Sequence, residues 1–173
     1  MVDESMSEPA DTPVPPEEPS FEEMFAAARA FAMRSLARRE NAESELANRL
    51  RKQGFNDEVI GSVLDYCRGY HWVDDERYGA MAVRAGATKG QGPIKIRFDL
   101  RRKGLSDTQI ETAFEQPELD WFELAAELLQ RRARASDLGD FKVRMKWLKY
   151  LLGRGFNQEQ ARHALSAMQE RGD

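Results

Sequence analysis

Apolar residues recur at helical spacing over most of the chain and predict a protein built from α-helices. They fall three or four positions apart over residues 25–36, again over residues 42–50, and again over residues 59–67. No segment alternates apolar and polar residues over the roughly four to eight positions that a half-buried strand needs. The pattern therefore predicts an all-α fold.

The same helical pattern returns three times. Each copy holds the sequence Leu-x-x-x-Gly, then an apolar residue, then Asn or Ser, a residue type that caps the start of a helix. The three copies are Leu50 to Gly54, Leu100 to Gly104, and Leu151 to Gly155. In the last two, Gln109 and Gln160 follow the cap at the distance of a capping box. We expect three-helix repeats over residues 21–72, 73–117 and 118–173, stacked into an elongated, solenoid-like array.

The second helix of the middle repeat carries apolar residues on two sides. At about 100° per residue, Ile94 and Phe98 lie on one side of this helix. Ile96 and Leu100 lie almost opposite. A helix with two apolar stripes is expected to lie between two neighbours, so we predict that both stripes are buried. Residues 141–152 show a similar doubled pattern.

Composition excludes several classes of protein. Of 173 residues, 41% are hydrophobic and 32% are charged, and no apolar run approaches the roughly 18 residues of a membrane helix. The N-terminus is acidic and has no apolar core, so we do not expect a signal peptide. A single cysteine, Cys67, allows no internal disulfide and fits a reducing compartment. We therefore expect a cytoplasmic protein, not associated with membranes, that is a monomer.

The negative net charge conceals a basic body. Residues 1–23 hold eight acids and no bases, and residues 1–20 are also rich in proline, so we predict a disordered acidic tail there. Residues 77–103 carry eight basic side chains against one acid, and residues 131–154 carry eight against two. Such basic faces bind phosphate backbones or acidic protein surfaces, although solvated charge on exposed helices is a simpler explanation.

We nominate thirteen basic residues as contacts to a partner protein or to DNA, chosen by where the positive charge gathers. They are Arg77, Arg84, Lys89, Lys95, Arg97, Arg101, Arg102, Lys103, Arg131, Arg132, Lys142, Arg144 and Lys146.

No group of residues predicts catalysis. Asp74 and Asp75 are expected to cap a helix and complement its dipole, with an ion pair to a neighbouring repeat's arginine as the alternative. Residues 88–93 predict a sharp turn between helices; their glycines could instead cradle a phosphate, but they follow no strand. His71 and His163 have no partners at metal-ligand spacing. We therefore predict no catalytic residue, no metal and no cofactor.

An ordered set of short motifs resembles the RecX regulatory proteins of bacteria. The set covers about residues 30–168 and is most specific over residues 70–105, whereas the acidic tail lies outside it. Its members are Leu36-Ala37-Arg38-Arg39, Ser44-x-Leu46, Leu50-x-x-x-Gly54-Phe55, Val73-Asp74-Asp75-x-Arg77-Tyr78, Gly90-x-Gly92-Pro93-Ile94-x-Ile96, Leu100-Arg101-x-Lys103-Gly104-Leu105 and Asp120-Trp121.

This resemblance implies a non-enzymatic protein that binds the RecA recombinase, chiefly its nucleoprotein filament. Proteins of this kind lodge in the groove of the filament and suppress its ATPase, strand-exchange and coprotease activities. The residues leave two alternatives open beside this interpretation. One is a stand-alone DNA-binding protein that coats single or double strands without reading sequence. The other is a nucleotide-using enzyme built on the turn at residues 88–93.

Overall fold

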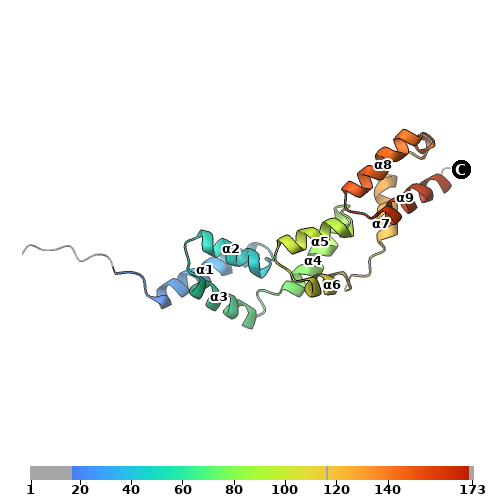
Figure 1. Ribbon diagram of the computed structural model, residues 1–173. Helices are drawn as coiled ribbons and strands as arrows, with labels where there is room; N and C mark the ends of the chain where they lie inside the picture. The colour runs from blue at the N-terminus through green and yellow to red at the C-terminus, as the bar shows by residue number, and fades with distance from the viewer. Residues whose placement is uncertain (1–16, 116, 172–173) are drawn as a thin grey trace, which may run out of the picture.

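A computed structural model describes residues 17–115 and 117–171 of the chain. Over these residues it contains nine α-helices, a short 3-10 helix and no strand, which confirms the all-α prediction (Figure 1). Most of the predicted tail, residues 1–16, lies outside the described part. The helices are α1 (Phe21–Arg38), α2 (Glu43–Lys52), α3 (Asp57–Gly69), α4 (Asp75–Thr88), α5 (Pro93–Arg102), α6 (Asp107–Glu115), α7 (Trp121–Arg132), α8 (Phe141–Gly153) and α9 (Gln158–Glu170), with the 3-10 helix η1 (Ala135–Gly139) before α8.

The helices form three consecutive trios, as the repeat pattern predicts. Repeat 1 is α1–α3, repeat 2 is α4–α6 and repeat 3 is α7–α9, and each trio surrounds its own hydrophobic core. Leu50 is buried at the centre of the first core, Leu100 in the second and Leu151 in the third. The helix pairs that pack most extensively all lie within one repeat. Figure 1 shows the trios in a row, so the body is elongated.

The predicted helix caps are present. The side chain of Asn56 accepts a hydrogen bond from the backbone of Val59 at the start of α3. Gln109 and Gln160 both complete capping boxes, with Ser106 and Asn157 respectively. Each box satisfies backbone N–H groups that the first turn of a helix leaves without a partner. The short sequence pattern after each glycine therefore fixes where the third helix of each repeat begins.

The three anchor glycines explain how the repeats stack. Gly54, Gly104 and Gly155 all have left-handed backbones, with φ of 92°, 88° and 97°. A Cβ atom on Gly104 would lie 2.6 Å from that of Ser44, and one on Gly155 would lie 2.4 Å from that of Lys95. The turn of one repeat is thus pressed against the first residues of the second helix of the preceding repeat. Gly54 belongs to the first repeat and would meet nothing within 4 Å.

The prediction that α5 is sandwiched between two neighbours is wrong. Its Ile96 and Leu100 stripe is buried, with 3% and 2% exposure, but Ile94 and Phe98 are 56% and 58% exposed. Repeat 3 touches the start of α5 and repeat 1 touches the residues just after its end, and its outer face stays uncovered. Helical periodicity shows on which side an apolar residue lies, but it does not show whether a neighbour covers that side.

Helix α8 differs from its counterparts in length. It has 13 residues, whereas α2 and α5 have ten each. All three end two residues before the anchor glycine, so the additional turn is at the N-terminus of α8. Phe141, in this turn, is 69% exposed. Leu151 is fully buried, while Trp147 and Leu152 pack at the edge of the same core, so α8 is not sandwiched either.

Candidate partner-binding surface

Two of the nominated basic residues hold repeats 1 and 2 together. Lys103 Nζ lies 2.9 Å from a carboxylate oxygen of Glu45, which also accepts a hydrogen bond from Arg39. Burial raises the pKa of Glu45, but the hydrogen bonds from Lys103 and Arg39 outweigh it and leave that pKa below its usual value. Arg77 binds both carboxylate oxygens of Glu40, at 2.8 and 3.1 Å. Arg77 and Lys103 therefore have structural partners within the chain.

Asp74 and Asp75 lie at the contact between repeats 1 and 2, and we call each contact between consecutive repeats a joint. Asp74 caps α4 by accepting hydrogen bonds from the backbone N–H groups of Glu76 and Arg77, as predicted. Asp75 accepts a 2.8 Å hydrogen bond from the backbone N–H of Glu43 and so caps the start of α2 in the preceding repeat. Burial raises the pKa of Asp75, and this hydrogen bond opposes the rise. The inter-repeat partner of Asp75 is thus a backbone group and not an arginine.

Four further nominated residues form ion pairs on exposed surfaces. Such pairs contribute little to stability, typically about 0–1 kcal/mol, so an anionic partner can replace the carboxylate at small cost. Arg97 is the most constrained, because its guanidinium also lies 4.0 Å from the centre of the Phe114 ring. The pairs are Lys95–Asp99 at 3.7 Å, Arg97–Glu111 at 3.1 Å, Arg101–Asp107 at 3.1 Å and Arg131–Glu127 at 3.9 Å.

The remaining seven nominated residues take part in none of the ion pairs formed among residues 17–115 and 117–171. Their charge is therefore free to meet a partner. They are Arg84, Lys89, Arg102, Arg132, Lys142, Arg144 and Lys146. Arg84 and Lys89 lie on or just after α4, Arg102 ends α5, Arg132 ends α7, and the other three lie on α8.

The outer face of α5 combines exposed apolar and basic groups. Ile94 and Phe98 are more than half exposed, and the guanidinium of Arg102 lies 5.8 Å from the centre of the Phe98 ring. Arg101, one residue before Arg102, is exposed as well. Buried aromatic and arginine side chains contribute much of the energy of protein interfaces. We name Ile94, Phe98, Arg101 and Arg102 the α5 face; charge location alone did not identify its two apolar members.

The turn at residues 88–93 is not a phosphate cradle of the kind formed by backbone N–H groups. The N–H groups of Gly92 and Ile94 donate to the carbonyl oxygens of Arg154 and Gly155, at 2.8 and 2.9 Å. The side chain of Arg154 in turn donates to the carbonyl oxygens of Lys89 and Gly90. These backbone donors are already used to join repeats 2 and 3, so the nucleotide-site alternative loses its structural basis. Pro93 begins α5, where its lack of a backbone N–H group leaves no helical hydrogen bond unmade.

The histidines do not form a metal centre. His71 is exposed, and its backbone, at φ 56°, presents a carbonyl oxygen to the guanidinium of Arg77 at 2.9 Å. His163 packs edge-on against Phe122. Within the described residues there is no group of three or more potential ligands that could hold a metal ion.

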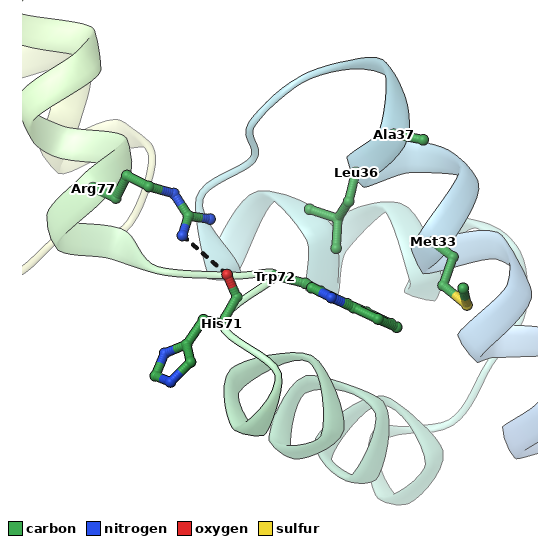
Figure 2. Close-up of a pocket in the computed structure, with 6 residues that line it drawn as sticks. All are labelled: Met33, Leu36, Ala37, His71, Trp72 and Arg77. Atoms are coloured by element: carbon green, nitrogen blue, oxygen red, sulfur yellow. Dashed lines mark hydrogen bonds between the residues drawn. The ribbon is translucent and has the colours of Figure 1, made fainter.

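A small apolar pocket lies beside His71 in repeat 1. Its volume is about 340 Å³, and it is lined by Met33, Leu36, Ala37, His71, Trp72 and Arg77. Figure 2 shows the Trp72 ring and the Leu36 side chain within it, while the imidazole of His71 points away from Met33 and Leu36. Among these lining residues only His71 could act as an acid or a base, and no second such group accompanies it.

The fold and this surface define a class: a helical-repeat protein whose exposed face joins apolar and basic groups. The comparison with known sequences then gives the family. Residues 28–67 match the first three-helix domain of RecX, residues 74–113 the second and residues 118–165 the third. The chain belongs to the RecX family of regulatory proteins, and this family is not enzymatic.

Individual relatives agree with this assignment. The chain is 34% identical to the regulatory protein RecX of Vibrio vulnificus over 78% of its own length and 88% of that protein. It is 33% identical to that of Halorhodospira halophila over 83% and 89% of the two lengths. The crystal structure of RecX from Lactobacillus salivarius has a TM-score of 0.75 and 18% identity, covering 85% of this chain and 97% of that one. That likeness shows the shared fold.

No helix among the described residues combines the length and the apolar character needed to cross a membrane.

Proposed function

We propose that this protein binds the RecA nucleoprotein filament in the cytoplasm as a monomer and inhibits its ATPase, strand-exchange and coprotease activities. Membership of the RecX family supports the partner. The α5 face carries the proposal, because Ile94 and Phe98 are large apolar groups left in water at the middle of an elongated molecule. A partner that covers them gains roughly 25 cal/mol for each Å² of apolar surface removed from water. Arg101 and Arg102 beside them complement an acidic neighbour.

The experiment measures the DNA-stimulated ATPase of RecA with increasing amounts of this protein over a series of salt concentrations. We expect inhibition by the full chain and by a form that lacks residues 1–20. The double variant Ile94→Ala, Phe98→Ala should require at least about tenfold more protein for half inhibition, since two anchors of about 1 kcal/mol or more are lost.

The matched control is Tyr70→Ala, which removes an aromatic ring of similar exposure, 59%, from repeat 1. It should inhibit like the unaltered chain. An ATPase that stays unchanged at stoichiometric excess of the full chain overturns the proposal. If the unaltered chain and the α5 double variant inhibit equally and both have normal melting curves, the contact with RecA does not lie on the α5 face.

Binding to DNA alone is the second candidate, and the seven unpaired basic residues favour it. Charges without an intramolecular partner release counterions when they meet phosphates, so affinity for naked DNA should fall steeply with salt. Tight binding to RecA together with weak, salt-sensitive binding to naked DNA rejects this candidate in favour of the first.

A further inference from the structure

A small polar pocket lies where repeats 2 and 3 meet. Its volume is about 130 Å³, well below the roughly 300 Å³ at which pockets begin to enclose drug-sized ligands. It holds about four waters at about 30 Å³ each, which is room for one tetrahedral oxyanion. The end of α4 forms one wall and the end of α7 the other. The lining residues are Thr88, Lys89, Gly90, Leu128, Arg131 and Arg132, and none is acidic.

The basic side chains around this pocket are poorly neutralised. Neither Lys89 nor Arg132 enters an ion pair with any described residue. Arg131 has only Glu127, at 3.9 Å, and both of these side chains are at least half exposed. Gathering like charges at one place costs free energy, and an anion placed between them recovers it.

The helix ends account for only part of this charge. Cations are favourable near a helix C-terminus, where carbonyl oxygens lack partners. Arg131 and Arg132 lie in the last turn of α7 and meet this requirement, and Arg131 also donates to the carbonyl oxygen of Glu127. At the end of α4, Arg154 donates to the carbonyl oxygens of Lys89 and Gly90 at 2.6 and 3.0 Å. The side chain of Lys89 is therefore additional to what the end of α4 requires.

We propose that this pocket binds one phosphate group, held by Lys89, Arg131 and Arg132 through charge-assisted hydrogen bonds. The phosphate can come from a nucleic-acid backbone or from a free phosphate ion, because either presents the same oxygens. The proposal does not depend on binding to RecA. It differs from a nucleotide cradle, because side chains and not backbone N–H groups hold the anion.

Binding of an anion in this pocket affects how repeats 2 and 3 are held together. Lys89 belongs to repeat 2, whereas Arg131 and Arg132 belong to repeat 3. An anion between them bridges two repeats that otherwise meet through the turn at Gly155 and the hydrogen bonds of Arg154. A bound phosphate thus stabilises the arrangement of repeats 2 and 3 that this structure shows.

The test uses the full chain and two probes, inorganic phosphate and a thymidine oligonucleotide, at constant ionic strength. Phosphate should raise the melting temperature more than chloride does, because a ligand that binds only the folded state stabilises it. Arg132→Gln and Lys89→Gln should each weaken binding about tenfold, the size expected for losing one hydrogen bond to a charged group. Glu127→Gln should strengthen binding, since it removes the carboxylate that competes for Arg131.

Arg34→Gln is the matched control, because Arg34 is exposed on α1 in the distant first repeat. It should bind like the unaltered chain. Oligonucleotide binding that needs Arg132, without a response to free phosphate, assigns the phosphate to a nucleic-acid backbone and upholds the site. If the unaltered chain, Arg132→Gln, Lys89→Gln and Glu127→Gln all melt alike without ligand and bind both probes equally, the proposal is overturned.

Discussion

Three glycines with the same backbone conformation occupy different surroundings in this protein. All have φ near +90°, a region in which L residues are strained. Gly104 and Gly155 are also pressed against the preceding repeat, but Gly54 has open space around its Cα. The sequence motif Leu-x-x-x-Gly is identical at all three positions. Only the second and third copies therefore combine a conformational requirement with a packing requirement.

Substituting alanine at each glycine separates these two requirements. Gly54→Ala should lower the free energy of unfolding by about 1–2 kcal/mol from backbone strain alone. Gly104→Ala and Gly155→Ala should lose about 1–3 kcal/mol more, because the added methyl collides with Ser44 or Lys95. Urea denaturation followed by circular dichroism measures the three values. Equal losses at all three positions would show that the joints accommodate a methyl group without cost.

The roles of single residues within their own helices were the most predictable feature of this structure. Local chemistry alone locates the caps at Asn56, Ser106 and Asn157, because a capping side chain bonds to its own helix. The role of Asp75 was not predictable, since its partner, the backbone of Glu43, is 32 residues away in the sequence. The thirteen nominated basic residues remain predictions as partner contacts, and sequence could not show that Arg77 and Lys103 have partners inside the chain.

At the level of helices, α5 shows that only one of two apolar stripes on a helix packs in the core. One stripe supplies the core of repeat 2, and the other stripe lies in water. Both stripes are equally apolar in sequence, so periodicity predicts two buried faces. The exposed stripe is distinguished only by the tertiary arrangement, in which the adjacent repeats meet α5 at its two ends and not along its length.

Truncating one residue from each stripe tests this division. Leu100→Ala should cost about 2–5 kcal/mol of stability, as expected for a buried leucine. Phe98→Ala should cost about 0.5 kcal/mol or less, since its ring is more than half exposed. Thermal and urea unfolding of the two variants give the comparison. A loss below about 1 kcal/mol for Leu100→Ala would remove that residue from the core.

The whole molecule has three firm cores and two thinner joints. The extensive helix packing lies within the repeats, and the joints are made by turns, hydrogen bonds, a few ion pairs and single apolar residues such as Ala42 and Trp121, which pack against the core of repeat 2. Regions held by few apolar contacts open at lower free energy than the cores they connect. We therefore expect the repeats to move relative to one another before any of them unfolds.

Amide hydrogen exchange at the second joint measures this motion. Arg154→Met removes two hydrogen bonds to repeat 2, so the amides of Gly92 and Ile94 should exchange roughly tenfold faster or more. The amide of Leu100, within the core of the same repeat, should keep its rate. Arg162→Met, an exposed change on α9, is the control. Uniform acceleration throughout repeat 2 would indicate unfolding of the repeat instead of opening of the joint.

The additional turn at the start of α8 has a consequence for how long such a chain can become. At the start of α5, the backbone N–H groups of Gly92 and Ile94 have no acceptor within the helix and donate hydrogen bonds to carbonyl oxygens of repeat 3. Counted back from the anchor glycine, the matching positions in α8 are Val143 and Met145, which lie inside the helix, and its backbone N–H groups are engaged in helical hydrogen bonds from Arg144 onward. Another three-helix unit could not stack on α8 as repeat 3 stacks on α5 unless the additional residues Phe141–Val143 were removed or unwound.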